Sequence, residues 1–314
     1  MSPIRIYLGT QPEQSLATQV LAHSIRQHTR APIETTPLYQ AVAAANIHLP
    51  TPRSPHLRPR TPFTFQRFAI PALCHYQGRA LYLDSDMLVF SDIKELWQQS
   101  FQTSQGTADL LSVPEPADSD RPPQYSVMLL NCEQLTWDAP HLIEQLEAGK
   151  WTYEEFVLKM APARKKAAAL PLGWNDLERY TSGQTRLIHY TDMPHQPWLS
   201  TDNPLCELWC QALLNAIAQN AISCDSVRDS VRRGWVRPSL LVQVDRDIAN
   251  PQDLPHQVLE QDRQSFTPPH IWQRYLRHPA LQGERSRQWF NRAYALYKTT
   301  RKAAKTIDSQ NALA

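Results

Sequence analysis

The stretch that decides the fold is Arg79-Ala80-Leu81-Tyr82-Leu83-Asp84-Ser85-Asp86-Met87-Leu88-Val89-Phe90. An apolar run typical of a buried strand ends there on two carboxylates that are one residue apart. In an extended chain the side chains of Asp84 and Asp86 face the same way, so the strand delivers two oxygen ligands to one point. Two like charges this close repel each other, and a divalent cation such as Mg²⁺ or Mn²⁺ would remove the repulsion. Such ions complete their coordination with phosphate oxygens and water.

The composition narrows the classes of function. The chain has 314 residues and a formal net charge of +2, which gives no reason to expect nucleic-acid binding. No apolar run approaches the roughly 18 residues of a membrane span, and the start does not read as a signal peptide, so we expect a cytoplasmic protein. The five cysteines form no Cys-x-x-Cys pair, and we expect them to be reduced. The eight glycines are too scattered for a Rossmann fingerprint or a P-loop, which favours a metal ion as the means of holding a phosphate.

Strand and helix patterns alternate along most of the chain. We expect strands at residues 4–10, 33–38, 79–83, 108–113, 126–130 and 186–190. We expect helices at residues 13–28, 64–76, 92–97, 140–149, 153–160 and 205–231, the last as one helix or two. The alternation predicts an α/β fold with a mostly parallel central sheet flanked by helices. Ligands of such sheets bind beyond the carboxyl ends of the strands, which is where Asp84 and Asp86 fall.

The character of the chain changes near residue 235. We therefore expect a catalytic domain at 1–235 and a C-terminal extension at 236–314, with residues 250–279 loosely structured because proline and charge are frequent there. Residues 285–305 carry seven cationic side chains, no acidic one, and several aromatic residues between them. A basic aromatic helix of this kind either lies on an anionic membrane surface, here the inner face, or packs on the domain with its charges in water.

Four segments, in the expected order, resemble glycosyltransferase family 8, the retaining enzymes that include glycogenin and bacterial lipopolysaccharide galactosyl- and glucosyltransferases. The segments are Ile6-Tyr7-Leu8-Gly9-Thr10, then 65–86 with its Asp-x-Asp motif, Ser126-Val127-Met128-Leu129-Leu130-Asn131, and 188–198 with His189-Tyr190 and Pro197-Trp198. Together they span roughly residues 4–200. The resemblance implies a GT-A fold, a nucleotide-sugar donor that is usually a UDP-sugar, and Mn²⁺ or Mg²⁺ as cofactor.

The resemblance also implies roles for individual positions. The family holds its metal with both aspartates of the Asp-x-Asp motif and with the histidine of the last segment, which here are Asp84, Asp86 and His189. A histidine on a strand is more often a core residue, but imidazole beside two carboxylates suits Mn²⁺. The donor-binding positions that the resemblance implies are Leu8, Gly9, Thr10, Arg67, Asp84, Ser85, Gln196 and Trp198.

The sequence departs from the family pattern at several positions. Gln196 stands where the family has a lysine that touches the diphosphate, and Asp192 stands at a glycine position. The Asp-Gln-Asp segment of the family is not recognisable. Gln124 falls where the family has an asparagine that contacts the sugar, and Glu154 belongs to the nearest segment with carboxylates, so these two are the expected catalytic residues. For Glu154 the competing interpretation is an ordinary solvated helix face.

The function predicted from these residues is metal-dependent, retaining transfer of a hexose from UDP-glucose or UDP-galactose to a glycan or lipid-linked glycan. A nucleotide-sugar-binding protein of the same fold with impaired catalysis is an alternative, because the lysine is missing. A phosphatase similar to the haloacid dehalogenases, with Asp84 as nucleophile, is a further one. Leu88 opposes it, since those enzymes need threonine or valine at that position and carry the motif close to the N-terminus.

Overall fold

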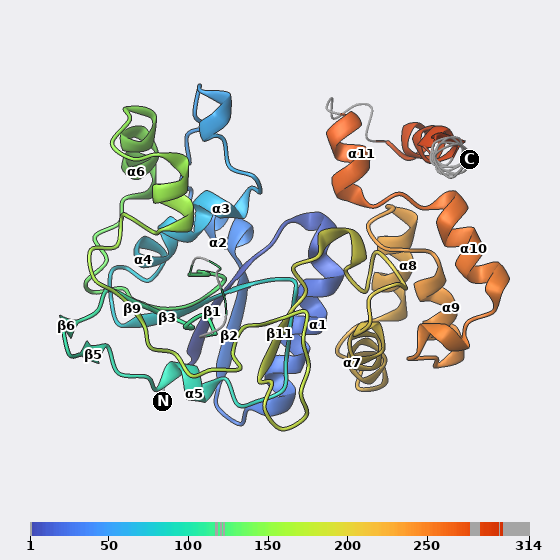
Figure 1. Cartoon of the computed structure of the whole chain (residues 1–314), viewed down its shortest axis with the longest axis horizontal. Helices are drawn as coiled ribbons and strands as arrows, with labels where there is room; N and C mark the ends of the chain where they lie inside the picture. Colours follow the sequence, from blue (N-terminus) through green and yellow to red (C-terminus); the bar gives the residue numbers. More distant parts are fainter. Residues whose placement is uncertain are drawn as a thin grey trace, which may run out of the picture. The chain divides into compact units, whose positions relative to one another are not determined.

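The computed structural model describes residues 2–116, 119, 121, 123–276, 283–294 and 296–297. The chain divides into two compact units, Met1–Thr191 and Asp192–Ala314. The first unit contains the sheets and the second is helical (Figure 1). The domain boundary at residue 235 stays a prediction.

The first unit is built on a six-stranded sheet with the strand order β2-β1-β3-β8-β7-β9. Its strands are β1 (Ile4–Gly9), β2 (Ile33–Pro37), β3 (Arg79–Asp84), β7 (Leu110–Ser112), β8 (Val127–Asn131) and β9 (Lys166–Ala168). In this sheet β8 pairs antiparallel with β3 and β7, while the other pairs are parallel. The predicted α/β fold with a mostly parallel central sheet is therefore confirmed.

Both faces of this sheet are covered, which explains why its central strands are continuous apolar runs. Along β3, Ala80 and Tyr82 belong to one buried cluster and Leu81 and Leu83 to the other, because successive side chains alternate between the faces. The Tyr82 face is covered by α2 (Leu38–Ala44), α3 (Phe63–Gln66), α4 (Ile70–Leu73) and α6 (Ala139–Glu147). The opposite face is covered by α1 (Ser15–His28) and α5 (Lys94–Trp97).

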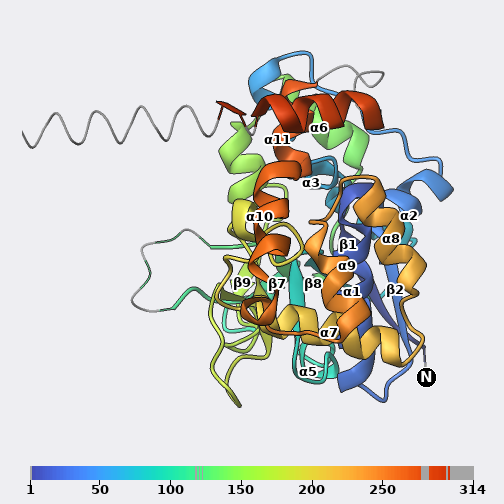
Figure 2. The same cartoon turned by 90° about the vertical axis from the view of Figure 1, so that its right-hand side faces the viewer.

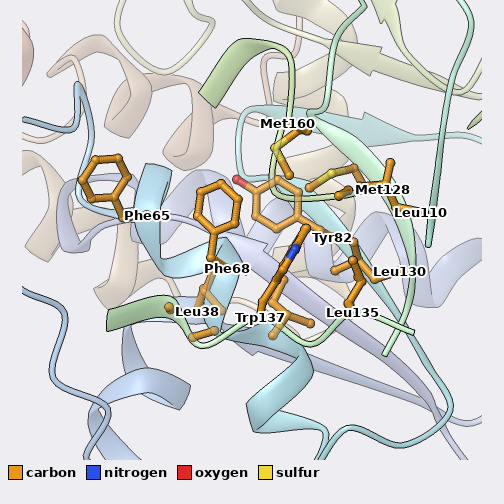
Figure 3. Packing of buried hydrophobic residues seen from close by; sticks show 14 of the residues in the cluster. Leu38, Phe65, Phe68, Tyr82, Leu110, Met128, Leu130, Leu135, Trp137 and Met160 are labelled. Carbon is orange, nitrogen blue, oxygen red and sulfur yellow. The ribbon is translucent and has the colours of Figure 1, made fainter. Parts of the chain in front are cut away.

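Aromatic rings fill the core on the Tyr82 face. Phe68 packs edge-on against Trp137 with the ring centroids 5.1 Å apart, and both rings lie close to Tyr82 (Figure 3). Phe68 itself lies in a 3₁₀ turn, Arg67–Ala69, between α3 and α4. The predicted helix at 64–76 is therefore three short helical segments, which together place Arg67 beside the end of β3.

A second sheet, with the order β10-β11-β4, carries the chain away from the Asp-x-Asp motif. Its strands are β4 (Met87–Val89), β10 (Asp176–Leu177) and β11 (Leu187–His189). The antiparallel register of β4 and β11 sets His189 opposite Met87, and the backbone N–H of Tyr190 donates to the carbonyl oxygen of Asp86 at 2.8 Å. This register brings the distant His189 to the motif.

The remaining elements of the first unit are short. They are the hairpin β5 (Gln102–Thr103) and β6 (Gly106–Thr107), the 3₁₀ helices Pro12–Gln14 and Pro55–Leu57, and a π-helix at Glu154–Leu158.

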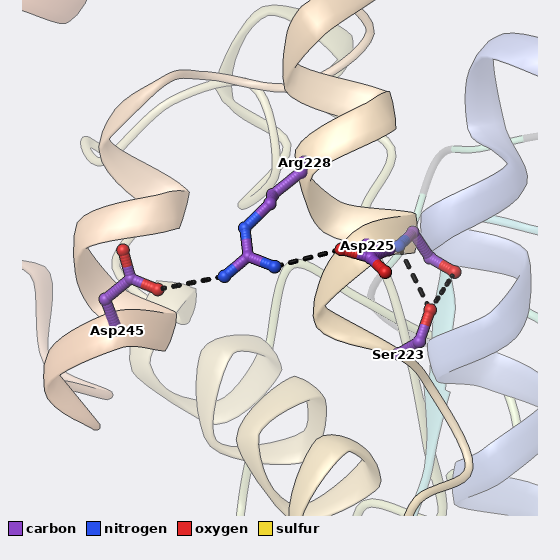
Figure 4. Close-up of polar contacts among 5 residues, drawn as sticks. Ser223, Asp225, Arg228 and Asp245 are labelled. Carbon is purple, nitrogen blue, oxygen red and sulfur yellow. Dashed lines mark hydrogen bonds and ion pairs between the residues drawn. The ribbon is translucent and has the colours of Figure 1, made fainter.

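The second unit consists of helices and the segments that join them (Figure 2). They are α7 (Cys206–Ala218), α8 (Cys224–Arg232), α9 (Ser239–Arg246), α10 (His256–Ser265) and α11 (Pro269–Tyr275), with residues 284–294 and 296–297 also helical. The predicted pattern at 205–231 is two helices, because Ser223 caps the start of α8 by accepting from the N–H of Ser226. Arg228 of α8 then links Asp225 to Asp245 of α9 (Figure 4).

The expectation that residues 250–279 are loosely structured was wrong for the described part of that range. Helices α10 and α11 occupy it, and Pro255, Pro268 and Pro269 stand at their starts, where a missing backbone N–H costs no helical hydrogen bond. Residues 298–305 of the predicted basic helix lie outside the described residues. Among the helices that the structure describes, none is long and apolar enough to cross a membrane.

Candidate metal and donor site

The backbone brings three segments together at one edge of the central sheet. Because β1 and β3 are parallel, Gly9 and Asp84 end their strands side by side, and the N–H of Ser85 donates to the carbonyl oxygen of Gly9 at 3.0 Å. Because β8 runs the other way, it starts where these strands end, and the N–H of Asp84 donates to the carbonyl oxygen of Ser126 at 3.1 Å. The edge is the place where ligands of such sheets bind.

Asp84, Asp86 and His189 form a cluster that could hold a metal ion. Each offers one ligand atom, and these atoms lie within 4.8 Å of one another. Nε2 of His189 is 3.2 Å from Oδ1 of Asp86. Adjacent ligands of an octahedral ion with bonds of about 2.1 Å are separated by about 3 Å, so the spacing fits. The structure thus brings together the three residues that the resemblance implies as metal ligands.

The orientation of the His189 ring supports a metal at Nε2. Its Nδ1 lies 3.0 Å from Oδ1 of Asn175, an oxygen that can only accept, so Nδ1 carries the proton. A neutral ring then turns the lone pair of Nε2 toward the Asp86 carboxylate, which is repulsive unless a proton or a cation lies there. Metal-binding histidines are held in this way, with the second ring nitrogen donating to a fixed acceptor.

The pKa shifts of the cluster also show that a proton can take the place of a cation there. Burial alone would lower the pKa of His189, but the charge and hydrogen bond of Asp86 raise it, and the net direction is upward. Burial raises the pKa of Asp84, and the neighbouring charge of Asp86 raises it further. Both groups therefore take up protons more readily than usual when no cation is present.

Tyr82 fixes the first aspartate. Its hydroxyl donates to Oδ1 of Asp84 at 2.5 Å, and burial keeps the pKa of this phenol well above its ordinary value, so it stays protonated. Tyr82 reaches Asp84 because residues two apart on a strand share a face. Gly9 leaves room for the ring, since a Cβ there would lie against the Tyr82 hydroxyl and 2.8 Å from Cζ.

Three of the predicted donor-binding residues near these ligands are buried, and two of them, Ser85 and Thr10, are polar. The side chain of Ser85 is 1% exposed, and its hydroxyl has no hydrogen-bond partner among the described residues. Thr10 is also 1% exposed and shares a hydrogen bond of 2.7 Å with Thr18 of α1. Leu8 is a buried residue of β1. A buried hydroxyl without a partner between two metal-binding candidates is typical of a site that a ligand completes.

A cavity of about 310 Å³ opens beside Asp84. Arg67, Gln124 and Tyr153 line it, so the structure brings two of the predicted donor and catalytic residues to the metal cluster. Arg67 is 9% exposed, and it donates from Nε to the carbonyl oxygen of Thr64 at 3.0 Å. The cavity is large enough for a single sugar ring.

The cavity lining does not include the other predicted catalytic residue, and two predicted donor-binding residues belong to the second unit. Glu154 is exposed, pairs with Lys159 at 3.5 Å and does not line this cavity. Gln196 and Trp198 belong to the second unit, where each is 2% exposed and Trp198 packs against Trp209 with ring centroids 5.4 Å apart.

Three residues of the site were not among the predicted ones. Tyr82 could have been found from its position two residues before Asp84 on the same strand. Asn175 and Tyr153 carried no such signal, because only the pairing of β10 with β11 and the packing of the π-helix bring them to the site.

Part of the sequence is similar to known proteins. Residues 10–108 match the model of the family described as glycosyl transferase family 8. Protein CDI of Arabidopsis thaliana is 26% identical over 254 residues, which cover 72% of this chain and 92% of that protein.

Similar solved structures include the apo form of the bifunctional glycosyltransferase WbbM, with 14% identity and a TM-score of 0.49. They also include apo GlyE of Streptococcus pneumoniae TIGR4, with 14% identity and a TM-score of 0.49, and an active-site mutant of LgtC, with 17% and 0.47. The matches cover 70%, 70% and 67% of this chain. They span 51% of the WbbM chain, 64% of GlyE and 95% of LgtC.

Proposed function

We propose that this chain, which belongs to glycosyltransferase family 8 and is a glycosyltransferase, takes its sugar from a UDP-sugar and uses Asp84, Asp86 and His189 to hold a divalent ion. The observation that carries the proposal is the ring of His189, whose Nδ1 is held by Asn175 while its Nε2 faces Asp86. Carboxylates suit both Mg²⁺ and Mn²⁺. Because Mn²⁺ is a transition metal, it accepts an imidazole ligand more readily than Mg²⁺ does, so Mn²⁺ is the first candidate.

The residues of the site have separable tasks in this proposal. When bound, the ion would supply Lewis-acid charge to the diphosphate that leaves the sugar. Tyr82 holds the Asp84 carboxylate in one orientation, and Asn175 holds the His189 ring. Gln124 lines the cavity in which we expect the sugar, where its amide can stabilise charge on the sugar ring.

The nucleoside is expected at the end of β1. Gly9 and Thr10 lie directly beside the motif, since the N–H of Ser85 donates to the Gly9 carbonyl oxygen at 3.0 Å. The unsatisfied hydroxyl of Ser85 is available to a ribose hydroxyl there. Transfer with retention of configuration is part of the proposal because the resemblance to the retaining enzymes implies it.

The acceptor in this proposal is a glycan or a lipid-linked glycan, met by a cytoplasmic enzyme at the surface of an anionic membrane. The second unit supports it by an exposed face on the helix whose described residues are 284–294 and 296–297, called here the helix at 284–297. Trp289 is 67% exposed and Leu296 is 68% exposed, and Arg285 and Arg292 are exposed on the same helix. Aromatic and apolar side chains with flanking arginines are typical of helices that lie in the membrane interface.

One alternative within the family is a protein that binds the donor but does not turn it over. The uncharged Gln196 at the expected lysine position and the exposed Glu154 favour this alternative. The phosphatase alternative is removed by the family assignment.

Donor binding and turnover test the proposal together. Thermal unfolding and release of UDP would be followed with a panel of UDP-sugars, once with Mn²⁺ and once with chelator. We expect one donor class to raise the unfolding temperature only with Mn²⁺, with slow release of UDP. The Asp86→Asn variant should lose the response, because the loss of a metal ligand costs more than the 10–100-fold that outer-shell changes cost.

Glu178→Gln is the matched control, since Glu178 lies close enough to influence His189 but is not in the cluster. Unchanged metal-dependent binding in Asp86→Asn would contradict the metal assignment. Donor binding without release of UDP would support the alternative in which the protein binds the donor but does not turn it over.

A further inference from the structure

The second unit holds a cluster of buried polar atoms that lack partners. Nε1 of Trp272, Nε of Arg287 and Oδ1 of Asn291 are buried and make no hydrogen bond with the described residues. Trp272 belongs to α11 and is 3% exposed, while Arg287 and Asn291 lie on the helix at 284–297. The guanidinium carbon of Arg287 lies 5.4 Å from the centre of the Trp272 ring. Buried polar groups normally have partners, so this cluster is typical of a site that a ligand completes.

The charge of Arg287 is only partly balanced. In the described part of the chain no carboxylate lies within 4 Å of its guanidinium, and its side chain makes no hydrogen bond. Burial lowers the pKa of Arg287, the charge of Glu284 raises it and the charge of Arg233 lowers it. Arg233 is itself paired with Asp229 at 2.6 Å, and that carboxylate also holds Arg232. Of these described side chains, three guanidinium groups share two carboxylates, which leaves a surplus of positive charge.

Arg287 lies against the turn that follows α8. Gly234 has a φ of +69° in this turn, and a Cβ there would lie 3.3 Å from Nη1 of Arg287. Arg233, the residue before it, has its guanidinium carbon 4.8 Å from the centre of the Trp235 ring. Trp235 and Trp272 pack in one hydrophobic cluster. An anion bound at Arg287 would therefore also be attracted by the charge of Arg233.

An apolar cavity adjoins Arg287 on the helix at 284–297, which packs against α11 (Figure 1). Phe290 and Tyr294 follow Arg287 by three and seven residues, so the three side chains share one face of the helix. Both aromatic residues line the cavity of about 540 Å³, together with Tyr275 of α11. Phe290 also packs in the cluster of Trp272. The surface thus changes from a cation to apolar rings within one helical turn.

A cation beside an apolar cavity fits an amphiphile with an anionic head group. A free phosphate would use the guanidinium and leave the cavity empty, whereas a neutral detergent would use the cavity and leave the charge unmatched. The planar fork of arginine binds phosphate oxygens in two parallel hydrogen bonds. A hydrocarbon chain in the cavity would be stabilised by leaving water.

We propose that the second unit binds one lipid molecule that carries a phosphate group. Arg287 binds the phosphate beside the Trp272 indole, and the first part of the hydrocarbon chain lies in the aromatic cavity. This binding needs neither the metal cluster nor a nucleotide sugar, so it can fail while the proposed function stands. It also differs from adsorption to a charged membrane, because a discrete site binds single lipid molecules where no bilayer is present.

Calorimetric titration of the whole protein tests this site with ligands kept below the concentrations at which they form micelles. The ligands are inorganic phosphate, hexyl phosphate, decyl phosphate and decyl maltoside. Each methylene group that enters the cavity should tighten binding about fourfold, so decyl phosphate should bind at least about tenfold more tightly than hexyl phosphate. In Arg287→Gln the affinity for decyl phosphate should fall about tenfold while that for decyl maltoside stays the same. In Ala293→Trp, which fills the cavity, hexyl and decyl phosphate should bind alike.

Arg285→Gln is the matched control, because Arg285 is an exposed arginine on another face of the same helix. It should keep both the preference for phosphate and the dependence on chain length. Equal affinities of decyl phosphate and decyl maltoside for the unaltered protein would overturn the inference. Binding of inorganic phosphate as tight as that of decyl phosphate would overturn it too, since the site would then take free phosphate. An equal loss in Arg285→Gln would assign the effect to net charge, again against a discrete site.

Discussion

His189 has two neighbours of opposite character. The side-chain amide oxygen Oδ1 of Asn175 accepts a hydrogen bond from Nδ1, and the carboxylate of Asp86 faces Nε2 at 3.2 Å. The lone pair of Nε2 and the Asp86 carboxylate repel each other unless Nε2 takes a proton or binds a cation. A proton and a metal ion therefore compete for one nitrogen atom.

This competition predicts opposite pH responses of the metal-free and the metal-bound protein. The pKa of His189 is raised above 6.5, so its protonated form contributes stability that is fully present below about pH 6.5 and is lost as pH rises through the raised value. The pKa of Asp84 is also raised. Its protonation removes the charge repulsion with Asp86, so it too stabilises the metal-free protein as pH falls. Mn²⁺ needs both groups deprotonated, and its affinity should fall as pH falls.

The measurement is a Mn²⁺ titration between about pH 8 and about pH 6, with the unfolding temperature of chelator-treated protein followed in parallel. The Mn²⁺ affinity should decrease across this range while the contribution of the cluster to metal-free stability increases. A Mn²⁺ affinity that does not depend on pH would argue against His189 as a ligand.

Asn175 offers a test of the ring orientation. Asn175→Ala removes the acceptor of Nδ1, and outer-shell changes of this kind weaken metal affinity by 10–100-fold. We expect that loss in the Mn²⁺ titration, while the affinity for the UDP-sugar at saturating Mn²⁺ stays close to that of the unaltered protein. Asn215→Ala, on an exposed part of α7, is the control. A loss of donor affinity at saturating metal would instead place Asn175 against the donor.

At the scale of elements, the pairing of β1 with β3 depends on one missing side chain. Gly9 lies opposite Asp84 in the register, and the Tyr82 ring occupies the space where a Cβ of residue 9 would be. Tyr82 cannot move away freely, because it is buried and its hydroxyl is held by Asp84. The strand pair and the metal ligand are thus coupled through one phenol.

Gly9→Ala should therefore lower the free energy of unfolding by about 1–3 kcal/mol, the usual effect of overpacking in a core. It should also weaken metal binding, since the displaced phenol no longer orients Asp84. Tyr82→Phe removes the nearest clashing atom, so the double variant should be more stable than the sum of the two single changes predicts. Chemical denaturation of the four proteins measures the coupling, and strictly additive effects would show that the two residues do not interfere.

Five of the six strands of the main sheet, all but β9, and the carboxylate pair could be predicted because their signal is local. The run from Arg79 to Asp84 is apolar enough to mark a buried strand, and the two aspartates follow it directly. In the second sheet β11 falls within the strand predicted at 186–190, but β4 and β10 were missed, since they have three and two residues and carry little pattern. The approach of Asn175 to His189 follows from that sheet and was missed with it.

The helices at 256–275 were missed for a different reason. The prolines of this region were interpreted as helix breakers, but Pro255, Pro268 and Pro269 precede or open helices, where their fixed backbone angle is favourable. Composition alone does not distinguish a proline at a helix start from one inside a helix.

At the scale of the whole molecule, the second unit exposes apolar side chains on α11 and on the helix that follows it. Tyr275 is 61% exposed and Tyr297 is 50% exposed, near a cavity of about 540 Å³ lined by aromatic and aliphatic residues of α11 and of the helix at 284–297. Stacked rings hold this helix in shape, with Phe290 and Tyr294 centroids 5.6 Å apart. Exposed aromatic patches on a protein surface mark sites of interaction.

The last prediction concerns the membrane contact of this unit. On the helix at 284–297, Arg285 and Arg292 are two turns apart and lie on the same side as Trp289, so the positive charges flank the exposed ring. A basic residue near an anionic bilayer contributes about 1 kcal/mol, which is about a fivefold change in affinity. The double variant Arg285→Glu with Arg292→Glu should therefore bind vesicles containing phosphatidylserine at least about 25-fold more weakly than the unaltered protein.

Sedimentation with vesicles measures this binding, and raising the salt concentration should weaken it because exposed charges are screened. The control pair Arg246→Glu with Arg263→Glu changes the net charge by the same amount on α9 and α10, where both arginines are exposed. If the control pair lost as much binding as the test pair, the attraction would come from net charge alone and the helix at 284–297 would have no special part in it. If only the test pair loses binding, the same helix that exposes Trp289 brings the enzyme to the surface where a lipid-linked acceptor is found.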